Sequence, residues 1–267
     1  MKLTQFGISL TAALAFVASM PAFLDPPRAF AASIVQETAD QSDYRIQVDL
    51  GHRLNKDRFK DVRVSVENGV ITLTGSVALF ADREAAEEKA IHAKKDIAVR
   101  NQIRIAGTRV SDEDLQATLV KKLQYDRVGY GTTAFNAIGV SVHDGVVTLG
   151  GHAYGPMDKS SAHAVASYTP GVQDVIDEIQ VDPVSLMDDH IRLKVARLIY
   201  GYPALSKYAI DPGKPIRVSV QNGNVTLYGS VDSEADRDIA GIRANTATGV
   251  FKVTNELRVE GASSERK

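Results

Sequence analysis

A stretch of twelve residues occurs three times in this chain with small changes. It reads VSVENGVITLTG at residues 64–75, VSVHDGVVTLGG at 140–151 and VSVQNGNVTLYG at 218–229. The glycines that close the stretches are 76 and 78 residues apart. Solenoid repeats are shorter, about 20–50 residues, so this unit has the size of a small domain. The sequence therefore predicts a tandem array of one fold. A single catalytic cleft is unexpected, because it would need residues that the copies do not share.

Each stretch carries a turn dipeptide between two runs of alternating apolar and polar residues. Asn-Gly and Asp-Gly favour a β-hairpin with a two-residue type I′ turn, because both turn positions need a positive φ. In the first copy this turn pairs Val66 with Ile71 and Val64 with Leu73, which gives the hairpin one apolar face. The glycines of the motif are predicted to be structural, at the turn and at the close of the second run: Gly69 and Gly75, Gly145 and Gly151, Gly223 and Gly229.

The segments around each hairpin predict the rest of the domain. Before it, apolar residues at i, i+4 and i+8, such as Ile46, Leu50 and Leu54, line one face of a helix. After it come a second helical segment rich in alanine and a last alternating strand. Each copy therefore reads helix, strand, strand, helix, strand. This order predicts an α+β fold of three tandem α-β-β-α-β domains, each a three-stranded mixed sheet with two helices on one face.

Two polar positions recur at fixed places in the three copies. Seven residues after the closing glycine stand Asp82, Asp158 and Asp236, which we interpret as carboxylates that cap the second helix. A catalytic role for these residues is the less favoured alternative. In the last strand Asn101, Asp177 and Asn255 fall on the core side. Because a core-facing polar group needs partners, we expect them to bond to nearby backbone, with ligand binding as the alternative.

The copies differ most between the first helix and the hairpin. The second and third copies carry longer insertions there, residues 125–139 and 200–215, which are rich in aromatic residues and glycine. Loops that vary on a common scaffold are where binding residues concentrate. Tyr130, Phe135 and Tyr202 are therefore the candidate contacts with a lipid or a protein partner, and the first helix of the copy that carries each loop is the alternative.

The amino terminus resembles an export signal. Met1-Lys2 precedes an apolar stretch from Phe6 to Leu24, and Ala29-Phe30-Ala31 follows it. A basic start, an apolar core and a small-x-small tripeptide are the parts of a secretory signal, so we interpret residues 1–31 as a cleavable signal peptide. A retained membrane anchor is the alternative, since the stretch approaches the roughly 20 residues that span a bilayer.

Composition argues against several function classes. The chain has 31 basic and 33 acidic residues, and removal of residues 1–31 leaves a net charge near −3, which gives no electrostatic footprint for nucleic acid. It has no cysteine, hence no disulfide and no thiol nucleophile. A glycine pattern at residues 129–134 resembles a dinucleotide motif but lacks the preceding strand that the motif requires. His143 and His152 lie at opposite ends of one hairpin, too far apart to share a metal. We therefore expect no enzymatic activity, cofactor, metal or small-molecule substrate.

The repeated pattern V-x-V-x-[ND]-G-x-[VI]-T-L-x-G, followed by D-[RK] and by V-x-[ND]-x-[IL]-x-[VI], resembles the BON domain. This family is named for bacterial osmotically inducible periplasmic and nodulation proteins. The resemblance places three domains at residues 40–107, 110–182 and 186–261. The middle copy departs from the pattern at Gly150-Gly151-His152, and we expect its second strand to be irregular there.

The resemblance also implies a function. BON domains are associated with the bacterial envelope, with phospholipid binding, and with envelope integrity under osmotic or other stress. The chain is accordingly expected to be a non-enzymatic periplasmic protein that contacts the phospholipid surface. The alternative is a periplasmic chaperone or scaffold that holds outer-membrane or secreted polypeptides.

Overall fold

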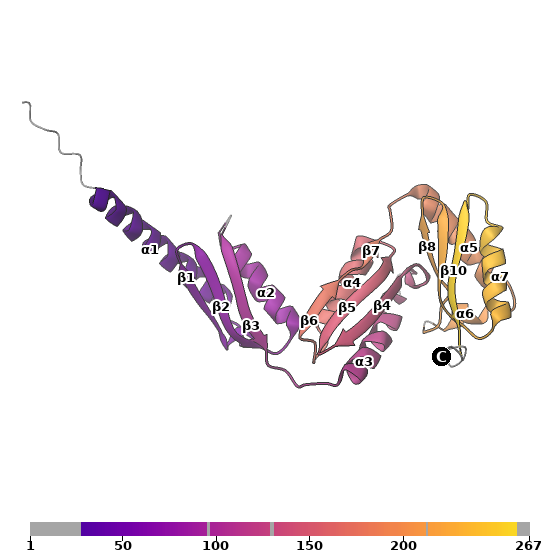
Figure 1. Ribbon diagram of the computed structural model, residues 1–267, viewed down its shortest axis with the longest axis horizontal. Coiled ribbons are helices and arrows are strands. Elements are labelled where there is room, and N and C mark those ends of the chain that lie inside the picture. The colour runs from indigo at the N-terminus through magenta and orange to yellow at the C-terminus, as the bar shows by residue number, and fades with distance from the viewer. Residues whose placement is uncertain (1–27, 95–96, 129–130, 212, 261–267) are drawn as a thin grey trace, which may run out of the picture.

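The computed structural model describes residues 28–94, 97–128, 131–211 and 213–260. Three small domains follow one another along the chain, each with one sheet and two main helices (Figure 1). The two helices pack against the outer strands of the sheet, α1 against β1 and α2 against β3. The predicted α+β class and the order helix, strand, strand, helix, strand are confirmed in all three domains.

The elements have the following bounds. The first domain contains α1 (Arg28–Arg53), the 3-10 turn η1 (Asp57–Phe59), β1 (Val62–Glu67), β2 (Val70–Val77), α2 (Phe80–Ile91) and β3 (Ala98–Ile105). The second contains α3 (Asp112–Tyr125), η3 (Thr133–Phe135), β4 (Ala137–His143), β5 (Val146–Ala153), α4 (Pro156–Ser167), β6 (Asp174–Asp177) and β7 (Gln180–Val181). The third contains α5 (Leu186–Tyr200), α6 (Lys207–Ile210), β8 (Arg217–Gln221), β9 (Asn224–Val231), α7 (Glu234–Asn245) and β10 (Lys252–Val259).

The sheets have the predicted hairpin register. In the first domain β1 pairs antiparallel with β2, which sets Val66 opposite Ile71 and Val64 opposite Leu73. The third strand of each domain returns through a helix and pairs parallel to the central strand. The hairpin strand before the turn, β1, β4 or β8, is therefore an edge of its sheet.

The turns have the conformation that the dipeptides predict. Asn68 and Gly69 have φ of 52° and 72°, and the two other turns are nearly identical. The glycines that close the motif are required for a second reason. A Cβ at Gly75 or Gly151 would collide with the backbone carbonyl of Asp61 or Ala137, and one at Gly229 would lie 2.7 Å from the Pro215 carbonyl oxygen.

An aspartate on the first helix of each domain holds the hairpin turn. The carboxylate of Asp43 accepts a hydrogen bond from the amide of Gly69 at 3.1 Å. Asp112 and Asp188 each accept two, from both amides of the corresponding turn. Motif reading alone misses these residues. Each nevertheless stands three residues before an apolar residue of the predicted helix face, Ile46, Leu115 or Ile191, and this constant offset is the signal that identifies them.

The middle domain corrects one prediction. The expected irregularity of its second strand is wrong, because β5 is continuous and pairs with β4 through Gly150 and Gly151. The interruption lies in the third strand, which is divided into β6 and β7. At the break, the Lys159 ammonium donates a hydrogen bond to the Ile179 carbonyl at 2.8 Å.

The three domains have three apolar cores, and two phenylalanines connect them. The predicted helix faces are buried, as Leu50, Leu119 and Val195 illustrate. Phe80 belongs to the first domain by sequence but packs in the core of the second. Phe135 belongs to the second domain and packs in the core of the third. Each of the two junctions between domains is therefore formed in part by buried apolar contacts.

The amino-terminal prediction lies mostly outside the described residues. Residues 1–27 are not described, and α1 begins at Arg28, before the expected cleavage point after Ala31. None of the helices within residues 28–260 that are described is both long and apolar enough to cross a membrane.

Candidate functional site

The three predicted contact residues lie in different surroundings. Tyr130 is outside the described residues. Phe135 is only 8% exposed and packs in the core of the third domain, so its ring is not available to a membrane or a partner. Tyr202 is partly exposed, and the Arg243 guanidinium lies 4.2 Å from the centre of its ring. Of the two described residues, both pack against the core of the third domain, and only Tyr202 is partly exposed.

The repeated aspartates lie at the start of the second helix, but not at the capping position. Asp82, Asp158 and Asp236 are each the third residue of their helix and are buried. Each carboxylate faces a cation from the segment before the hairpin of its own domain: Arg58 at 3.4 Å, Arg127 at 3.3 Å and Lys207 at 2.9 Å. Their role is therefore to tie this segment to the second helix.

The third domain has a well-connected version of this contact. Asp236 accepts hydrogen bonds from the Tyr208 hydroxyl at 2.8 Å and from the Lys207 ammonium. Burial acts to raise the pKa of Asp236, but the bonds from Lys207 and Tyr208 outweigh it and lower the pKa. The carboxylate is thus held in its charged form.

The polar residues of the last strands behave as predicted. Asn101 donates to the Arg83 carbonyl and accepts from the Ile103 amide, and Asn255 makes the equivalent bonds to Arg237 and Leu257. Asp177 accepts from the Ile179 amide. These side chains join the strand to the second helix.

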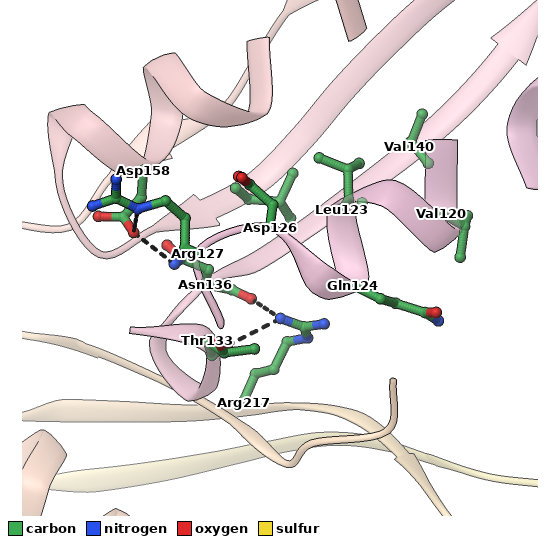
Figure 2. Close-up of a pocket in the computed structure, with 12 residues that line it drawn as sticks. Val120, Leu123, Gln124, Asp126, Arg127, Thr133, Asn136, Val140, Asp158 and Arg217 are labelled. Atoms are coloured by element: carbon green, nitrogen blue, oxygen red, sulfur yellow. Dashed lines mark hydrogen bonds and ion pairs between the residues drawn. The ribbon is translucent and has the colours of Figure 1, made fainter. Parts of the chain in front are cut away.

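A pocket of about 150 Å³ lies where the second and third domains meet (Figure 2). Its walls come from the end of α3, from β4 and from Arg217 at the start of β8. Leu123, Ile138 and Val140 give it an apolar side. Arg127 and Asp158 form its polar end, where Asp158 also accepts from Thr132 and Asn136.

Arg217 is the charged group that the third domain contributes to this pocket. One of its terminal nitrogens, Nη1, donates to the carbonyls of Thr133 and Asn136 (Figure 2). No carboxylate among the described residues forms an ion pair with Arg217. Burial therefore lowers the pKa of this guanidinium, although Tyr200 acts in the opposite direction. Arg217 was not a predicted site residue, because nothing in the sequence shows that its strand faces the preceding domain.

The domain 2–3 junction also contains a buried polar network. Arg192 and Asp182 are 1% and 0% exposed, and the guanidinium lies 3.4 Å from the carboxylate. Arg192 donates to the Val220 carbonyl at 2.7 Å, and its guanidinium lies 5.2 Å from the centre of the Tyr154 ring. Asp182 also accepts from Ser219 and Gln221. This network holds the end of the second domain against α5 and β8.

The histidines of the middle copy have separate partners. His143 is exposed beside Asp144, His152 lies 3.3 Å from Asp182, and His163 lies 2.9 Å from Glu84 of the first domain. Within the part of the chain that the structure describes, no three His, Asp or Glu side chains are grouped as metal ligands.

Several strongly exposed apolar side chains lie on or beside α5. Val184, Leu186 and Met187 are 91%, 82% and 67% exposed, and Leu193 lies two turns further along the helix. The exposed Phe251 lies at the same end of the domain, because its amide donates to the carbonyl of Gly223, whose own amide donates to Asp188 of α5. We call these five residues, Val184, Leu186, Met187, Leu193 and Phe251, the α5 surface.

The comparison with known protein families identifies the domain type. The BON domain family matches residues 42–107, 111–183 and 188–261. No curated protein matches the chain. Among solved structures, CdsD, a structural protein of the type III secretion system of Chlamydia trachomatis, is 17% identical, with 79% of this chain and 90% of that chain covered and a TM-score of 0.23. The periplasmic domain of the type III secretion inner-membrane protein PrgH from S. typhimurium is 11% identical, with 78% and 97% covered and a TM-score of 0.20.

Proposed function

The chain belongs to the BON domain family, with three tandem copies, and we propose that it is a non-enzymatic module of the bacterial envelope that binds phospholipid surfaces. We place it in the periplasm, exported by the amino-terminal signal. Family membership and the sequence of residues 1–31 support this location. The lipid-binding part of the proposal rests on the α5 surface.

The α5 surface is the observation that carries the proposal. A helix that lies on a membrane buries an apolar face at the boundary between headgroups and acyl chains. The corresponding first helix of the second domain, α3, exposes Val120 and Tyr125 as its large apolar residues, and α1 exposes Tyr44 and Val48 in its described part. The third domain therefore has the strongest candidate for membrane contact.

Charge near this surface is compatible with phospholipid. His190 and Lys194 are exposed on α5, between and beside the apolar residues. The net charge of the whole chain is −2, so attraction to an anionic surface has to come from such local groups. Apolar insertion is little affected by salt, whereas electrostatic attachment is screened. We expect binding that persists when salt is added.

Cosedimentation with phospholipid vesicles tests the proposal. The combined variant Leu186→Ser, Met187→Ser and Leu193→Ser removes three apolar side chains from α5. We expect this variant to lose most of its vesicle binding, because each buried Leu or Met side chain contributes roughly 1.5–3 kcal/mol.

A matched control removes three similarly exposed side chains elsewhere. Met157→Ser, Ile91→Ser and Ile242→Ser replace residues that are 68%, 54% and 64% exposed, on the second helices of the three domains. This control should bind vesicles as the wild type does. Equal loss in both variants would remove α5 as the site. Absence of cosedimentation with any lipid composition, together with suppressed aggregation of an unfolded outer-membrane protein, would favour the chaperone function instead.

A further inference from the structure

The edge strand β4 carries backbone hydrogen-bonding groups that point away from its own sheet. In an antiparallel hairpin with a two-residue turn, the pair that closes the turn, His143 and Val146, is hydrogen bonded, and pairs then alternate. Ser141 and Gly139 therefore bond to β5, whereas Ile138, Val140 and Val142 direct their N–H and C=O groups outward. Unpaired groups of this kind are a template for another strand.

The equivalent edges of the other domains are partly occupied by side chains. On β8, Arg192 donates to the outward carbonyl of Val220, and the Tyr200 hydroxyl donates to the carbonyl of Ile216 just before the strand. On β1, the outward amide of Val66 lies 3.4 Å from the side-chain oxygen of Gln47. No side chain of the described residues bonds to the outward groups of Ile138, Val140 or Val142. Among the described residues, β4 is thus the edge on which no outward group has a side-chain partner.

A depression lies on each side of the β4 edge. On the helix side is the pocket of Figure 2, with Val120 and Leu123 of α3 in its wall. On the other side is a groove of about 550 Å³ between β4 and the open sheet face of the third domain, where Tyr228 and Glu256 lie. Ile138, Gly139 and Arg217 line both depressions. Because side chains alternate along a strand, a strand added here would place successive side chains in the two depressions.

Arg217 supplies a charge at this edge. Its Nη1 donates to the two carbonyls. Nη2 and Nε have no hydrogen bond to any described residue, and both nitrogens reach solvent. A guanidinium with two free nitrogens, Nη2 and Nε, in a partly desolvated site favours a carboxylate, which it can bind in a bidentate manner.

We propose that the β4 edge binds an extended polypeptide segment as an added strand, with a carboxylate of that segment, from an acidic side chain or a chain end, on Arg217. Main-chain bonds would supply affinity and the two depressions would select side chains. A whole second copy of the domain fits less well. The sheet face of the third domain forms the far wall beside residues 137–139, and a single strand needs only the spacing of about 4.8 Å between neighbours. This inference does not depend on lipid binding, since the α5 surface and the β4 edge share no residue.

A library of displayed nine-residue peptides, selected on the full chain, provides the probes. Val140→Pro removes one outward N–H, and proline is tolerated at the open side of an edge strand. We expect enriched peptides to bind this variant about tenfold more weakly, because one main-chain hydrogen bond is lost and the peptide packs less closely at that position. The matched control Val64→Pro changes the equivalent outward position of β1 and should leave binding unchanged.

Two further measurements keep the test decisive if Val140→Pro folds poorly. Bound peptide should slow amide hydrogen exchange at Ile138, Val140 and Val142 of the wild-type chain. Arg217→Gln should weaken acidic peptides and leave uncharged ones unaffected, and carboxyl-terminal amidation separates a chain end from a side chain. Failure to enrich any peptide, or binding without protection at these amides, would overturn the proposal. So would dimerisation of the chain that Val140→Pro abolishes, because that result would assign the edge to a second copy.

Discussion

The two junctions between domains have one kind of apolar contact in common and differ in their polar contacts. In each, a phenylalanine of the preceding domain packs in the core of the next: Phe80 at the first junction and Phe135 at the second. The polar contacts are different. At the first junction, Arg83 with Asp174 and Glu84 with His163 form ion pairs between partly exposed side chains. At the second, Arg192 and Asp182 are fully buried.

This difference indicates different mechanical roles. Exposed ion pairs contribute little, because water and salt screen them and two side chains lose freedom. A buried pair is costly to break, because the remaining charge is left without solvent or partner. The second and third domains therefore form the firmer unit, and the first domain is attached by its phenylalanine and by weak polar contacts. The β4 edge and the α5 surface both lie on the firmer unit.

Loss of Arg192 should have the largest effect. Arg192→Met removes the guanidinium beside the buried Asp182 and leaves His152 as its basic neighbour, and we expect the free energy of unfolding to fall by about 3–5 kcal/mol. Arg83→Met, at the partly exposed pair of the first junction, should cost less than about 1 kcal/mol. Urea denaturation of both variants measures the comparison. Similar costs for the two variants would show that the junctions are equally strong.

Loss of a connecting phenylalanine should act on the following domain. Phe80→Ala should destabilise the second domain by roughly 3 kcal/mol, because its ring fills that core. Amide exchange should then accelerate in α3 and β5 more than in β2. Phe59→Ala is the control, since Phe59 is buried in the core of its own domain and should loosen β2 first. Faster exchange confined to the first domain after Phe80→Ala would contradict the assignment.

The repeated elements could be predicted from the sequence because their signals are local. A two-residue turn with positive φ and a period of two determine the register of Val64 with Leu73, and all three hairpins follow it. The bonds of Asn101 and Asn255 follow from the same reasoning, since a polar side chain facing a core needs nearby partners. Each of these inferences concerns residues within one copy.

The contacts between copies could not be predicted in the same way. The aromatic character of Phe135 suggests a binding loop, but whether its ring faces solvent depends on how the next domain is docked. Asp182 and Arg192 are ten residues apart and belong to different domains, and ordinary charge spacing does not mark them as a buried pair. The site around Arg217 likewise appears only once the second domain is placed against the third.

The first junction should respond to pH, and this is the smallest effect. The Glu84 hydrogen bond raises the pKa of His163 above its ordinary 6.5, and Asp177, 3.8 Å from the same ring, acts in the same direction against burial and Lys159. Burial acts to raise the pKa of Glu84, but hydrogen bonds from His163 and Ser167 outweigh it and lower the pKa below its ordinary 4.5. The contribution of His163 is complete below pH 6.5 and is lost as pH rises through its raised value. The contribution of Glu84 is complete above pH 4.5 and is lost as pH falls through its lowered value.

The first two domains should therefore be most firmly docked between about pH 4.5 and 6.5. The gain in docking free energy relative to pH 8 should be less than about 1 kcal/mol, because the side chains of Glu84 and His163 are partly exposed. The chain has no cysteine, so Glu67→Cys and His143→Cys can carry a donor and an acceptor dye on the two hairpins. The distribution of energy-transfer efficiency should broaden from pH 5.5 to pH 8. In Glu84→Gln it should be equally broad at both values, because the neutral amide cannot hold the imidazolium. A pH response that survives Glu84→Gln would place the titrating contact elsewhere and would remove this distinction between the junctions.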